Sequence, residues 1–512
     1  MDDLGKIRAT VSQFLTLRRT FVLVVFAGIF AFCTRAATDP DLWWHLSTGK
    51  LIVHSGGVPH TDPFSYSCAG QPWVAHEWLS EVFIYGVYRL ARWSGLIVAF
   101  ATATVGSFFF LYLRCLGKPY LAALLTLFGL FACSPVLGVR PQMLSFLLVS
   151  VLLWILERSE ANRKSLWWIP FIFVLWVNLH GAYAAGVLIL MIFTLAAFAH
   201  SWRSHDSWRL FIVLLISLIG IAVNPNGLRM YSYPFEVIHS ASMQNYIAEW
   251  FSPDFHKLAY APFMILILAL VVAFAVSPHK PSTRDLVLLL GTLWVALASV
   301  RHIPLFVLIS IPVLARCLRA LNWPGEKWAD THNRRNISLA RSSFHATFVV
   351  IAVLFASAQV TKVCNTQKAG QDRLYPSGAV AFLKSHTLPP NVFGYYDWGG
   401  YLIWSLYPEQ RVYIDGRADV YGDPIFRQFS DTYQLRHDWR RGLLGACTVV
   451  VPTSSALAAG LRVDNNWFTS YADEQAAVFQ ARYSEYDRRC APVSTIRSGN
   501  FTPAPSPKDA RI

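Results

Sequence analysis

Two carboxylates, Asp39 and Asp41, stand on either side of Pro40 in the segment ATDPDLWWH, directly after the first long apolar stretch of the chain. Asp39 is well explained as a helix cap, because Asp at the cap and Pro at the first helical position are both favoured where a helix begins. Asp41 is not needed for capping, and His45 lies one helical turn after it on the same face. We therefore predict that Asp41 is a proton-accepting catalytic base, with Asp39 as its rival for that role.

A second group of reactive side chains stands in the segment AHEWLSE, where His76 and Glu77 open an amphipathic stretch and Glu81 follows one turn later. Glu77 and Glu81 would be like-charged neighbours on one helix face, which is mildly unfavourable. Together with Asp41 and His45, this group suits a divalent cation, Mg²⁺ or Mn²⁺, with Asp41 and Glu77 as oxygen ligands. The spacing matches no recognised metal motif, so a solvated helix start is the alternative interpretation.

Further polar residues interrupt the apolar stretches: Arg140 in GVRPQ, His180 in NLHG, and the pair Arg301 and His302 in SVRH. Arginine is the side chain best suited to hold a phosphate group. The alternatives are an arginine that extends its charged end to the membrane surface, and a helix cap or interhelical hydrogen bond for His180. The predicted substrate-binding residues are therefore His45, His76, Glu77, Arg140, His180, Arg301 and His302.

These residues belong to a chain that is too apolar for an ordinary soluble protein. Of its 512 residues, 54% are hydrophobic and only 14% are charged. The net charge of +14 does not indicate nucleic-acid binding, because the basic residues are scattered between apolar stretches. A helix that crosses a bilayer needs about 20 mostly apolar residues. We expect about eleven such helices, near residues 20–36, 95–113, 119–137, 142–156, 166–178, 182–199, 209–223, 259–277, 285–300, 302–318 and 344–361.

The orientation of these spans follows from the short loops, because cytoplasmic loops carry more Lys and Arg. With the N-terminus inside, the inner segments hold nineteen basic residues and the outer segments hold eight. We therefore expect a multi-pass protein of the cell membrane with a cytoplasmic N-terminus and an extracytoplasmic C-terminal part. Nearly all of the unusual polar segments then lie on the outer side, which predicts a site on that face.

The composition changes after residue 361, which indicates a second domain. We expect a transmembrane domain over 1–361, in which the first outer loop, 37–94, carries two amphipathic surface helices. A soluble α/β domain follows over 362–495, and a disordered tail over 496–512. Helices are predicted in YPSGAVAFLKSH and WGGYLIWSLY, strands in NVFGYY, RVYIDG and ACTVVVP, and a hairpin in NNWFTSYADEQAAVFQARY. A hydrogen bond between Asp415 and Arg417 in a turn is favoured over a ligand site there.

This layout resembles the GT-C superfamily of integral-membrane glycosyltransferases. The segments DPDLWWHLSTG, HEWLSE, NPNGLRMYSYP, RHIPLF, YDWGGYLIW and VYIDGRADVY are similar to a bacterial group within it. The resemblance implies a sugar donor on a polyprenyl phosphate, a catalytic or metal-site acid at Asp39 or Asp41, and a lipid-phosphate ligand at Arg140 or Arg301. The chain departs from the mannosyltransferase pattern because Pro40 separates its two carboxylates and the second is Asp. The choice of base and any requirement for a metal therefore stay open.

From these features we expect a mostly α-helical, GT-C-like inner-membrane protein that acts as an inverting glycosyltransferase on the extracytoplasmic face. Its partners would be a polyprenyl-phosphate-sugar donor, membrane lipids, and a glycan, lipid or protein acceptor. The alternatives are a transporter or flippase for a lipid-linked glycan and a non-catalytic scaffold for envelope assembly. Ion-coupled transport usually requires ionisable residues within the spans, and none of the eleven segments has an acidic residue in its interior.

Overall fold

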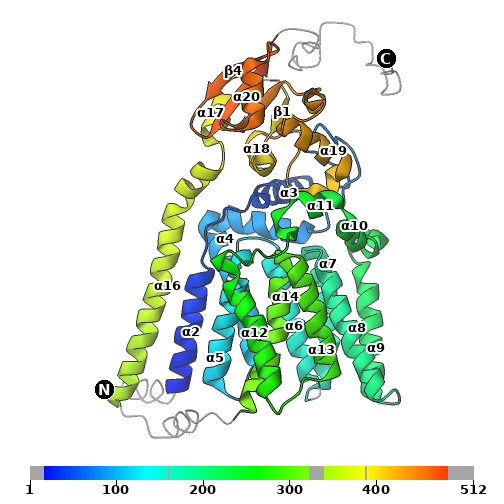
Figure 1. Cartoon of the computed structure of the whole chain (residues 1–512), viewed down its shortest axis with the longest axis vertical. Helices are drawn as coiled ribbons and strands as arrows, with labels where there is room; N and C mark the ends of the chain where they lie inside the picture. Colours follow the sequence, from blue (N-terminus) through cyan, green and yellow to red (C-terminus); the bar gives the residue numbers. More distant parts are fainter. Residues whose placement is uncertain (1–15, 160, 322–338, 387–388, 483–512) are drawn as a thin grey trace. The chain divides into compact units, whose positions relative to one another are not determined.

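The computed structural model describes residues 16–159, 161–321, 339–386 and 389–482 (Figure 1). The described residues form two compact units. The first contains the residues up to 60 together with 74–370, and the second contains 61–73 together with the residues from 371 onward. A short piece of the loop 37–94 thus folds with the C-terminal part of the chain. The predicted disordered tail, 496–512, lies outside the described residues.

The first unit is a bundle of apolar helices, with shorter helices across one of its ends (Figure 1). Every one of the predicted apolar segments is helical. The helices are α2 (Leu17–Cys33), α3 (Asp41–Ser55), α4 (Trp78–Arg114), α5 (Pro119–Cys133), α6 (Gln142–Arg158), α7 (Ile169–Leu179), α8 (Tyr183–His200), α9 (His205–Ile221), α10 (Tyr233–His239), α11 (Ala241–Tyr246), α12 (Ala261–Val276), α13 (Thr283–Ala298), α14 (Ile303–Arg319) and α16 (Leu339–Leu374).

Six helical segments in the described part of the chain are long and apolar enough to cross a membrane. They are Trp78–Arg114, Pro119–Val136, Tyr183–His200, Leu258–Val276, Val300–Arg319 and Ser343–Leu374. The other five predicted spans coincide with shorter helices, of 17 residues in α2, α6 and α9, 16 in α13 and 11 in α7. The chain is therefore a mostly helical, multi-pass membrane protein.

A buried ion pair fastens three of these helices where a proline breaks the hydrogen bonding of α14. Pro312 has no backbone N–H, so the Leu308 carbonyl loses its helical donor. Arg114 of α4 supplies the missing hydrogen bond, with 2.6 Å from its Nη1 to the Leu308 oxygen. Its other two nitrogens donate to the carboxylate of Glu157 in α6, at 2.8 and 2.7 Å. The arginine thus compensates for the proline and joins α4, α6 and α14.

The two predicted surface helices exist, and they pack tightly together. The first is α3, and the second is the start of α4, which ends at a backbone break where Arg92 has a φ of 52°. Gly49 of α3 makes the close approach possible, because a Cβ at this position would lie 2.1 Å from the Glu81 carbonyl oxygen. The glycine of the LSTG sequence therefore lets the residues at the start of α4 lie against α3.

The second unit is an α/β structure with a five-stranded mixed sheet in the order β2-β1-β3-β5-β4. Strand β1 pairs in parallel with β2 and β3, and β5 pairs antiparallel with β3 and β4. The strands are β1 (Asn391–Gly394), β2 (Arg411–Val412), β3 (Thr448–Pro452), β4 (Trp467–Ala472) and β5 (Ala476–Ala481), and the helices are α17 (Ser377–Ser385), α18 (Gly399–Leu406), α19 (Ala418–Tyr433) and α20 (Ala456–Val463). The predicted strands, hairpin and first two helices are confirmed, whereas α19 was not predicted.

Residues 61–73, here called the strap, extend this sheet beyond β2. The Phe64 carbonyl accepts a hydrogen bond from the Val412 N–H at 3.2 Å, and the Tyr66 N–H donates to the Val412 carbonyl at 3.0 Å. The side chain of Phe64 is fully buried. The segment between the two predicted surface helices is therefore part of the core of the second unit.

Candidate active site

The two carboxylates at the start of α3 have different surroundings. The Asp39 carboxylate accepts a hydrogen bond from the Asp41 backbone N–H at 2.9 Å and so satisfies a free N–H at the start of the helix, but Pro40 occupies the cap position that was predicted for Asp39. The Asp41 carboxylate accepts a hydrogen bond from the indole N–H of Trp44 at 3.1 Å. Burial, together with the neighbouring charge of Asp39, raises the pKa of Asp41 to about 7. No basic nitrogen lies within 4.0 Å of the Asp41 carboxylate in the described part of the chain.

Asp39 also forms an ion pair with Arg140, in the loop before α6. The distance from the Arg140 Nε to the Asp39 Oδ2 is 2.6 Å, and Nη2 contacts the same oxygen. On its other side, Nη1 of Arg140 contacts the carboxylate of Glu249. Burial lowers the pKa of Arg140, but the two carboxylates outweigh burial and raise it above the usual value. Arg140 is therefore a permanent cation between two anions.

Glu77, directly before α4, is surrounded by imidazoles. Its Oε1 lies 3.1 Å from the Nε2 of His76 and 3.7 Å from the Nε2 of His180. Its Oε2 lies 3.8 Å from the Nε2 of His45. Burial raises the pKa of Glu77, but the imidazoles outweigh burial and lower it below its usual value. Glu77 therefore stays ionised and holds three histidines from separate parts of the chain.

Hydrogen bonds fix the tautomer of His180. Its Nδ1 accepts from the Ala182 backbone N–H at 3.2 Å and lies 2.9 Å from the hydroxyl of Ser145. That hydroxyl accepts from the indole N–H of Trp176 at 2.7 Å, so it donates its own proton to Nδ1. The Nε2 of the neutral ring then carries the proton and points it at Glu77. Burial lowers the pKa of His180 to about 4, in agreement with a neutral ring.

His45 lies between two carboxylates of the α4 start. Its Nδ1 is 3.7 Å from the Oε1 of Glu81, which is too long for a hydrogen bond, and its Nε2 faces Glu77. Both His45 and Glu81 are almost completely buried. Burial lowers the pKa of His45, but the carboxylates of Glu81 and Glu77 outweigh it and raise the pKa above its usual value. The neighbouring acids therefore favour the protonated form of this buried imidazole.

Arg301 lies beside the segment that carries Glu249. Its guanidinium carbon lies 4.7 Å from the ring centre of Trp250, and the ring of His302 lies 6.1 Å from the same indole. The Ser299 hydroxyl donates to the Glu249 carbonyl at 2.8 Å, which fixes the two segments together. In contrast to Arg140, Arg301 has no carboxylate within 4.0 Å in the described residues. The Nδ1 of His302 is buried and has no hydrogen-bond partner.

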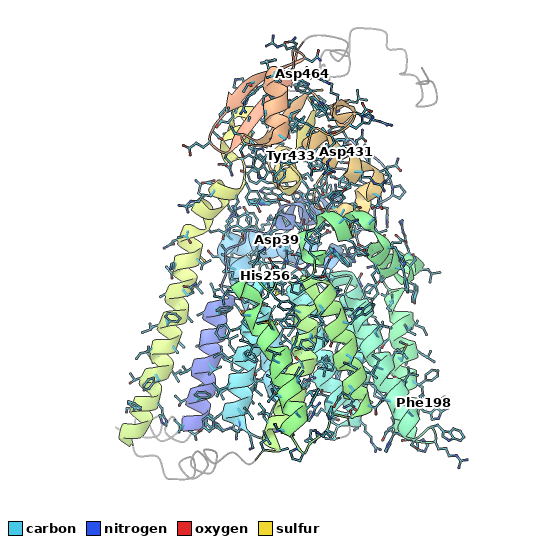
Figure 2. All side chains as sticks on the ribbon, viewed as in Figure 1. Asp39, Phe198, His256, Asp431, Tyr433 and Asp464 are labelled. Atoms are coloured by element: carbon cyan, nitrogen blue, oxygen red, sulfur yellow. The ribbon has the colours of Figure 1, made fainter. Side chains whose placement is uncertain are left out.

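The structure brings together all of the predicted site residues at one end of the first unit. Figure 2 shows Asp39 at this end and Phe198 of α8 at the opposite end. We call Asp39, Asp41, His45, His76, Glu77, Glu81, Arg140, His180, Glu249, Arg301 and His302 the polar cluster. Glu249 was not predicted. Its sequence gives no sign that it meets Arg140, because more than one hundred residues separate the two.

The side chains of this cluster do not fit a divalent cation. No three His, Cys, Asp or Glu side chains among the described residues are arranged as a metal site. The donor chemistry gives the reason: Asp39 and Glu249 are already paired with Arg140, and Glu77 faces imidazole rings. Asp41, the other predicted ligand, has a raised pKa that weakens it as an anionic ligand.

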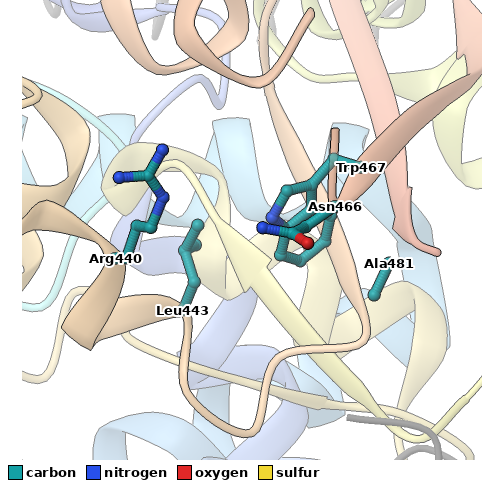
Figure 3. Close-up of a pocket in the computed structure, with 5 residues that line it drawn as sticks. All are labelled: Arg440, Leu443, Asn466, Trp467 and Ala481. Carbon is teal, nitrogen blue, oxygen red and sulfur yellow. The ribbon is translucent and has the colours of Figure 1, made fainter. Parts of the chain in front are cut away.

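The second unit contains a small hollow, but its charged residue is already paired. Arg440, Leu443, Asn466, Trp467 and Ala481 line this hollow (Figure 3). The Nε of Arg440 donates to Asp464 at 2.9 Å, and its guanidinium lies 4.4 Å from the ring centre of Trp439. The hollow therefore offers no free charge for a ligand.

The predicted hydrogen bond between Asp415 and Arg417 is present, at 2.8 Å from the arginine Nε. Arg417 also binds Asp62 of the strap at 2.8 Å, and the rings of Phe64 and Trp73 lie 5.0 and 4.6 Å from its guanidinium carbon. Its side chain is fully buried. The arginine therefore holds the strap within the second unit and is not a ligand-binding residue.

No family model and no curated protein matches the chain, but solved structures do. ArnT from Cupriavidus metallidurans bound to undecaprenyl phosphate is similar over 90% of this chain and 97% of that one, with 11% identity and a TM-score of 0.50. The archaeal oligosaccharyltransferase AglB from Archaeoglobus fulgidus, in complex with an inhibitory peptide and a dolichol-phosphate, is similar over 91% and 74%, with 11% identity and a TM-score of 0.55. The chain has the fold of the GT-C glycosyltransferases.

The mycobacterial arabinofuranosyltransferase AftD shares the GT-C fold over 92% of this chain and 40% of its own, with 13% identity and a TM-score of 0.50. At such identities the likeness concerns the fold alone. The fold that the resemblance implied is thereby confirmed, and the roles of single residues must be argued from the polar cluster itself.

Proposed function

We propose that this chain is an inverting membrane glycosyltransferase that transfers a sugar from a polyprenyl-phosphate donor to a hydroxyl of a glycan, lipid or protein acceptor. The observation that carries this proposal is the pairing of charges in the polar cluster. Among the described residues, no basic nitrogen lies within 4.0 Å of the Asp41 carboxylate, and no carboxylate lies within 4.0 Å of the Arg301 guanidinium. Transfer from such a donor needs one group that accepts a proton and one that binds a phosphate.

In the proposed reaction, the acceptor hydroxyl gives its proton to Asp41. The acceptor oxygen then forms a bond to the anomeric carbon of the donor sugar, on the face opposite the phosphate. The bond between that carbon and the phosphate oxygen breaks, and the electron pair leaves with the polyprenyl phosphate. Arg301 stabilises the charge that develops on this phosphate.

The other members of the polar cluster position these two groups. Asp39 and Arg140 fix the start of α3, because each is bound to the other and Asp39 accepts a hydrogen bond from the first N–H of the helix. The Glu77 carboxylate faces His45, His76 and His180, which come from α3, the start of α4 and the loop after α7. A base that is held rigidly in this way loses little entropy when the acceptor binds.

We infer that the reaction takes place on the extracytoplasmic face of the cell membrane, with eleven spans and a cytoplasmic N-terminus. The excess of Lys and Arg in the inner loops supports this orientation. Cys447 in the second unit is disulfide-bonded, which suits an oxidising compartment outside the cytoplasm. The solved ArnT and AglB structures, which hold undecaprenyl phosphate and a dolichol-phosphate, support a lipid-linked donor.

Mass spectrometry of envelope glycolipids and glycoproteins tests the proposal. We expect a strain without the gene to lose one sugar mass from an envelope component, and the wild-type gene to restore it. The Asp41→Asn variant, at an equal protein level, should not restore it. A normal glycan profile with this variant would contradict the catalytic proposal. Reconstituted vesicles that translocate a lipid-linked sugar without forming a product would favour a flippase instead.

A further inference from the structure

Arg140 joins two carboxylates that come from distant parts of the chain. Asp39 precedes α3, and Glu249 belongs to the short 3-10 helix η4 (Ala248–Trp250). Arg140 contacts Asp39 through Nε and Nη2 and Glu249 through Nη1. The side chains are largely buried, with exposed fractions of 18% for Arg140, 10% for Asp39 and 28% for Glu249. The contact is therefore a built part of the site rather than a surface ion pair.

A cation is needed at this position because two partly buried carboxylates repel each other across a short gap. Carboxylate oxygens from two separate segments are also the ligands that a hard divalent cation prefers. A guanidinium satisfies the same oxygens with directed hydrogen bonds and only one positive charge. It leaves the trio of Asp39, Arg140 and Glu249 with a net charge of about −1, whereas a divalent cation would make the trio neutral.

This difference in charge affects Asp41. A nearby divalent cation lowers the pKa of a carboxyl group and weakens it as a base. The remaining negative charge on Asp39 instead contributes to the raised pKa of Asp41. A guanidinium between Asp39 and Glu249 is thus compatible with a base that works near neutral pH.

We propose that the guanidinium of Arg140 takes the place of a divalent cation between Asp39 and Glu249, so that this chain transfers sugar without a metal ion. The structural half of this statement concerns cation binding and stands without the proposed function. The half that concerns sugar transfer rests on the proposed function.

Mn²⁺ binding to the purified full-length protein tests the structural half, with the paramagnetic resonance signal of free Mn²⁺ as the readout. We expect wild type to bind no Mn²⁺ at this position. Arg140→Ala should acquire one Mn²⁺ site. The affinity of this site should be roughly tenfold or more above any affinity for Mn²⁺ that wild type shows. The double variant Arg140→Ala/Glu249→Gln should lose it again. Arg229→Ala is the matched control, because the ion pair of Arg229 with Glu236, at 3.7 Å, is half exposed.

Two results would overturn the inference: Mn²⁺ bound by wild type and lost in Glu249→Gln, or a folded Arg140→Ala protein without an Mn²⁺ site. Thermal unfolding shows whether the variant is folded. If the variant is not folded, the wild-type protein tests the inference. Its rate of sugar transfer should change by no more than about twofold when a chelator is added. Transfer that is abolished by the chelator and restored by Mn²⁺ would refute the inference and leave the proposed function intact. An absence of transfer would refute the proposed function, and the Mn²⁺ titration would still decide the rest.

Discussion

Asp39 and Asp41 are two residues apart, and their partners make them chemically different. Asp39 accepts a hydrogen bond at the start of α3 and pairs with Arg140, so its carboxylate has a structural role. In the described part of the chain, the hydrogen-bond donor to the Asp41 carboxylate is the indole N–H of Trp44, and the pKa of Asp41 is raised to about 7. A carboxylate of this kind is a stronger base than an ordinary Asp.

The two carboxylates should therefore respond differently to the same substitution. Asp41→Asn should reduce sugar transfer by about 10²–10⁴-fold, the usual contribution of a general base. It should leave the unfolding temperature at pH 8 equal or higher, because it removes a buried charge. Asp39→Asn is the matched control and should lower stability by about 1–3 kcal/mol, because it breaks a charged hydrogen bond. Calorimetry together with a transfer assay measures both. Equal losses of stability would contradict the distinction.

The raised pKa of Asp41 also predicts a pH dependence. Below about pH 7 the carboxyl group is protonated and cannot accept a proton, so the transfer rate should fall about tenfold per pH unit. The folded protein holds this proton more tightly than the unfolded chain does. The resulting contribution to stability is complete below the ordinary pKa of Asp and is lost as the pH rises through about 7. The pH profile of kcat/KM measures the rate, and a flat profile from pH 5 to 8 would refute Asp41 as the base.

Arg301 should act on the lipid-linked donor and not on the acceptor. Arg301→Ala should lower kcat/KM for the donor by about 10²-fold, because a charged hydrogen bond to phosphate contributes roughly 2–3 kcal/mol. Arg301→Lys should recover part of this loss, since it keeps the charge but not the planar donor geometry. Steady-state kinetics in which first the donor and then the acceptor is varied separate an effect on the donor from an effect on the acceptor. A change confined to the KM of the acceptor would contradict this role.

At the scale of elements, the sequence predicts which segments are helices and strands better than it predicts what they contact. Hydrophobic spacing is local, so α3, the α4 start and the hairpin β4 and β5 could be found from it. The pairing of Arg140 with Glu249, and of Arg417 with Asp62, joins residues that are far apart in the chain. No local pattern records such contacts. Helix α19 was missed because Gly422 and Pro424 lie inside it, and these residues usually mark a turn.

The strap makes a further prediction about the second unit. Asp62→Asn leaves the fully buried Arg417 with Asp415 as its remaining carboxylate, so the free energy of unfolding should fall by about 1–3 kcal/mol. Asp431→Asn is the control, because the ion pair of Asp431 with Arg436 is about half exposed and should contribute less than about 0.5 kcal/mol. Limited proteolysis of the full-length protein measures the opening of the second unit. Equal cleavage rates in both variants would show that Asp62 does not hold the strap.

At the scale of the whole molecule, the strap constrains the path of the chain through the membrane. Residues 61–73 and the residues from 371 onward form one compact unit, so both must lie on the same side of the membrane. The chain between residues 73 and 371 must then cross the membrane an even number of times. The structure has six long apolar segments that begin within this interval, and the last of them ends just after it, at Leu374. Six is an even number, and so is the number of spans that the sequence predicts there, which is ten.

This parity makes the orientation testable with fusions at a few positions. A phosphatase that is active only outside the cytoplasm should be active when inserted at the exposed Gly57 in the first loop and when fused to the C-terminus. It should be inactive when inserted near Lys280, in a loop that we place inside. Opposite results at the first two positions would mean that the strap and the C-terminal part lie on different sides, which would refute the two-segment unit. Inactivity at both would put the polar cluster on the cytoplasmic face, where the proposed extracytoplasmic reaction could not take place.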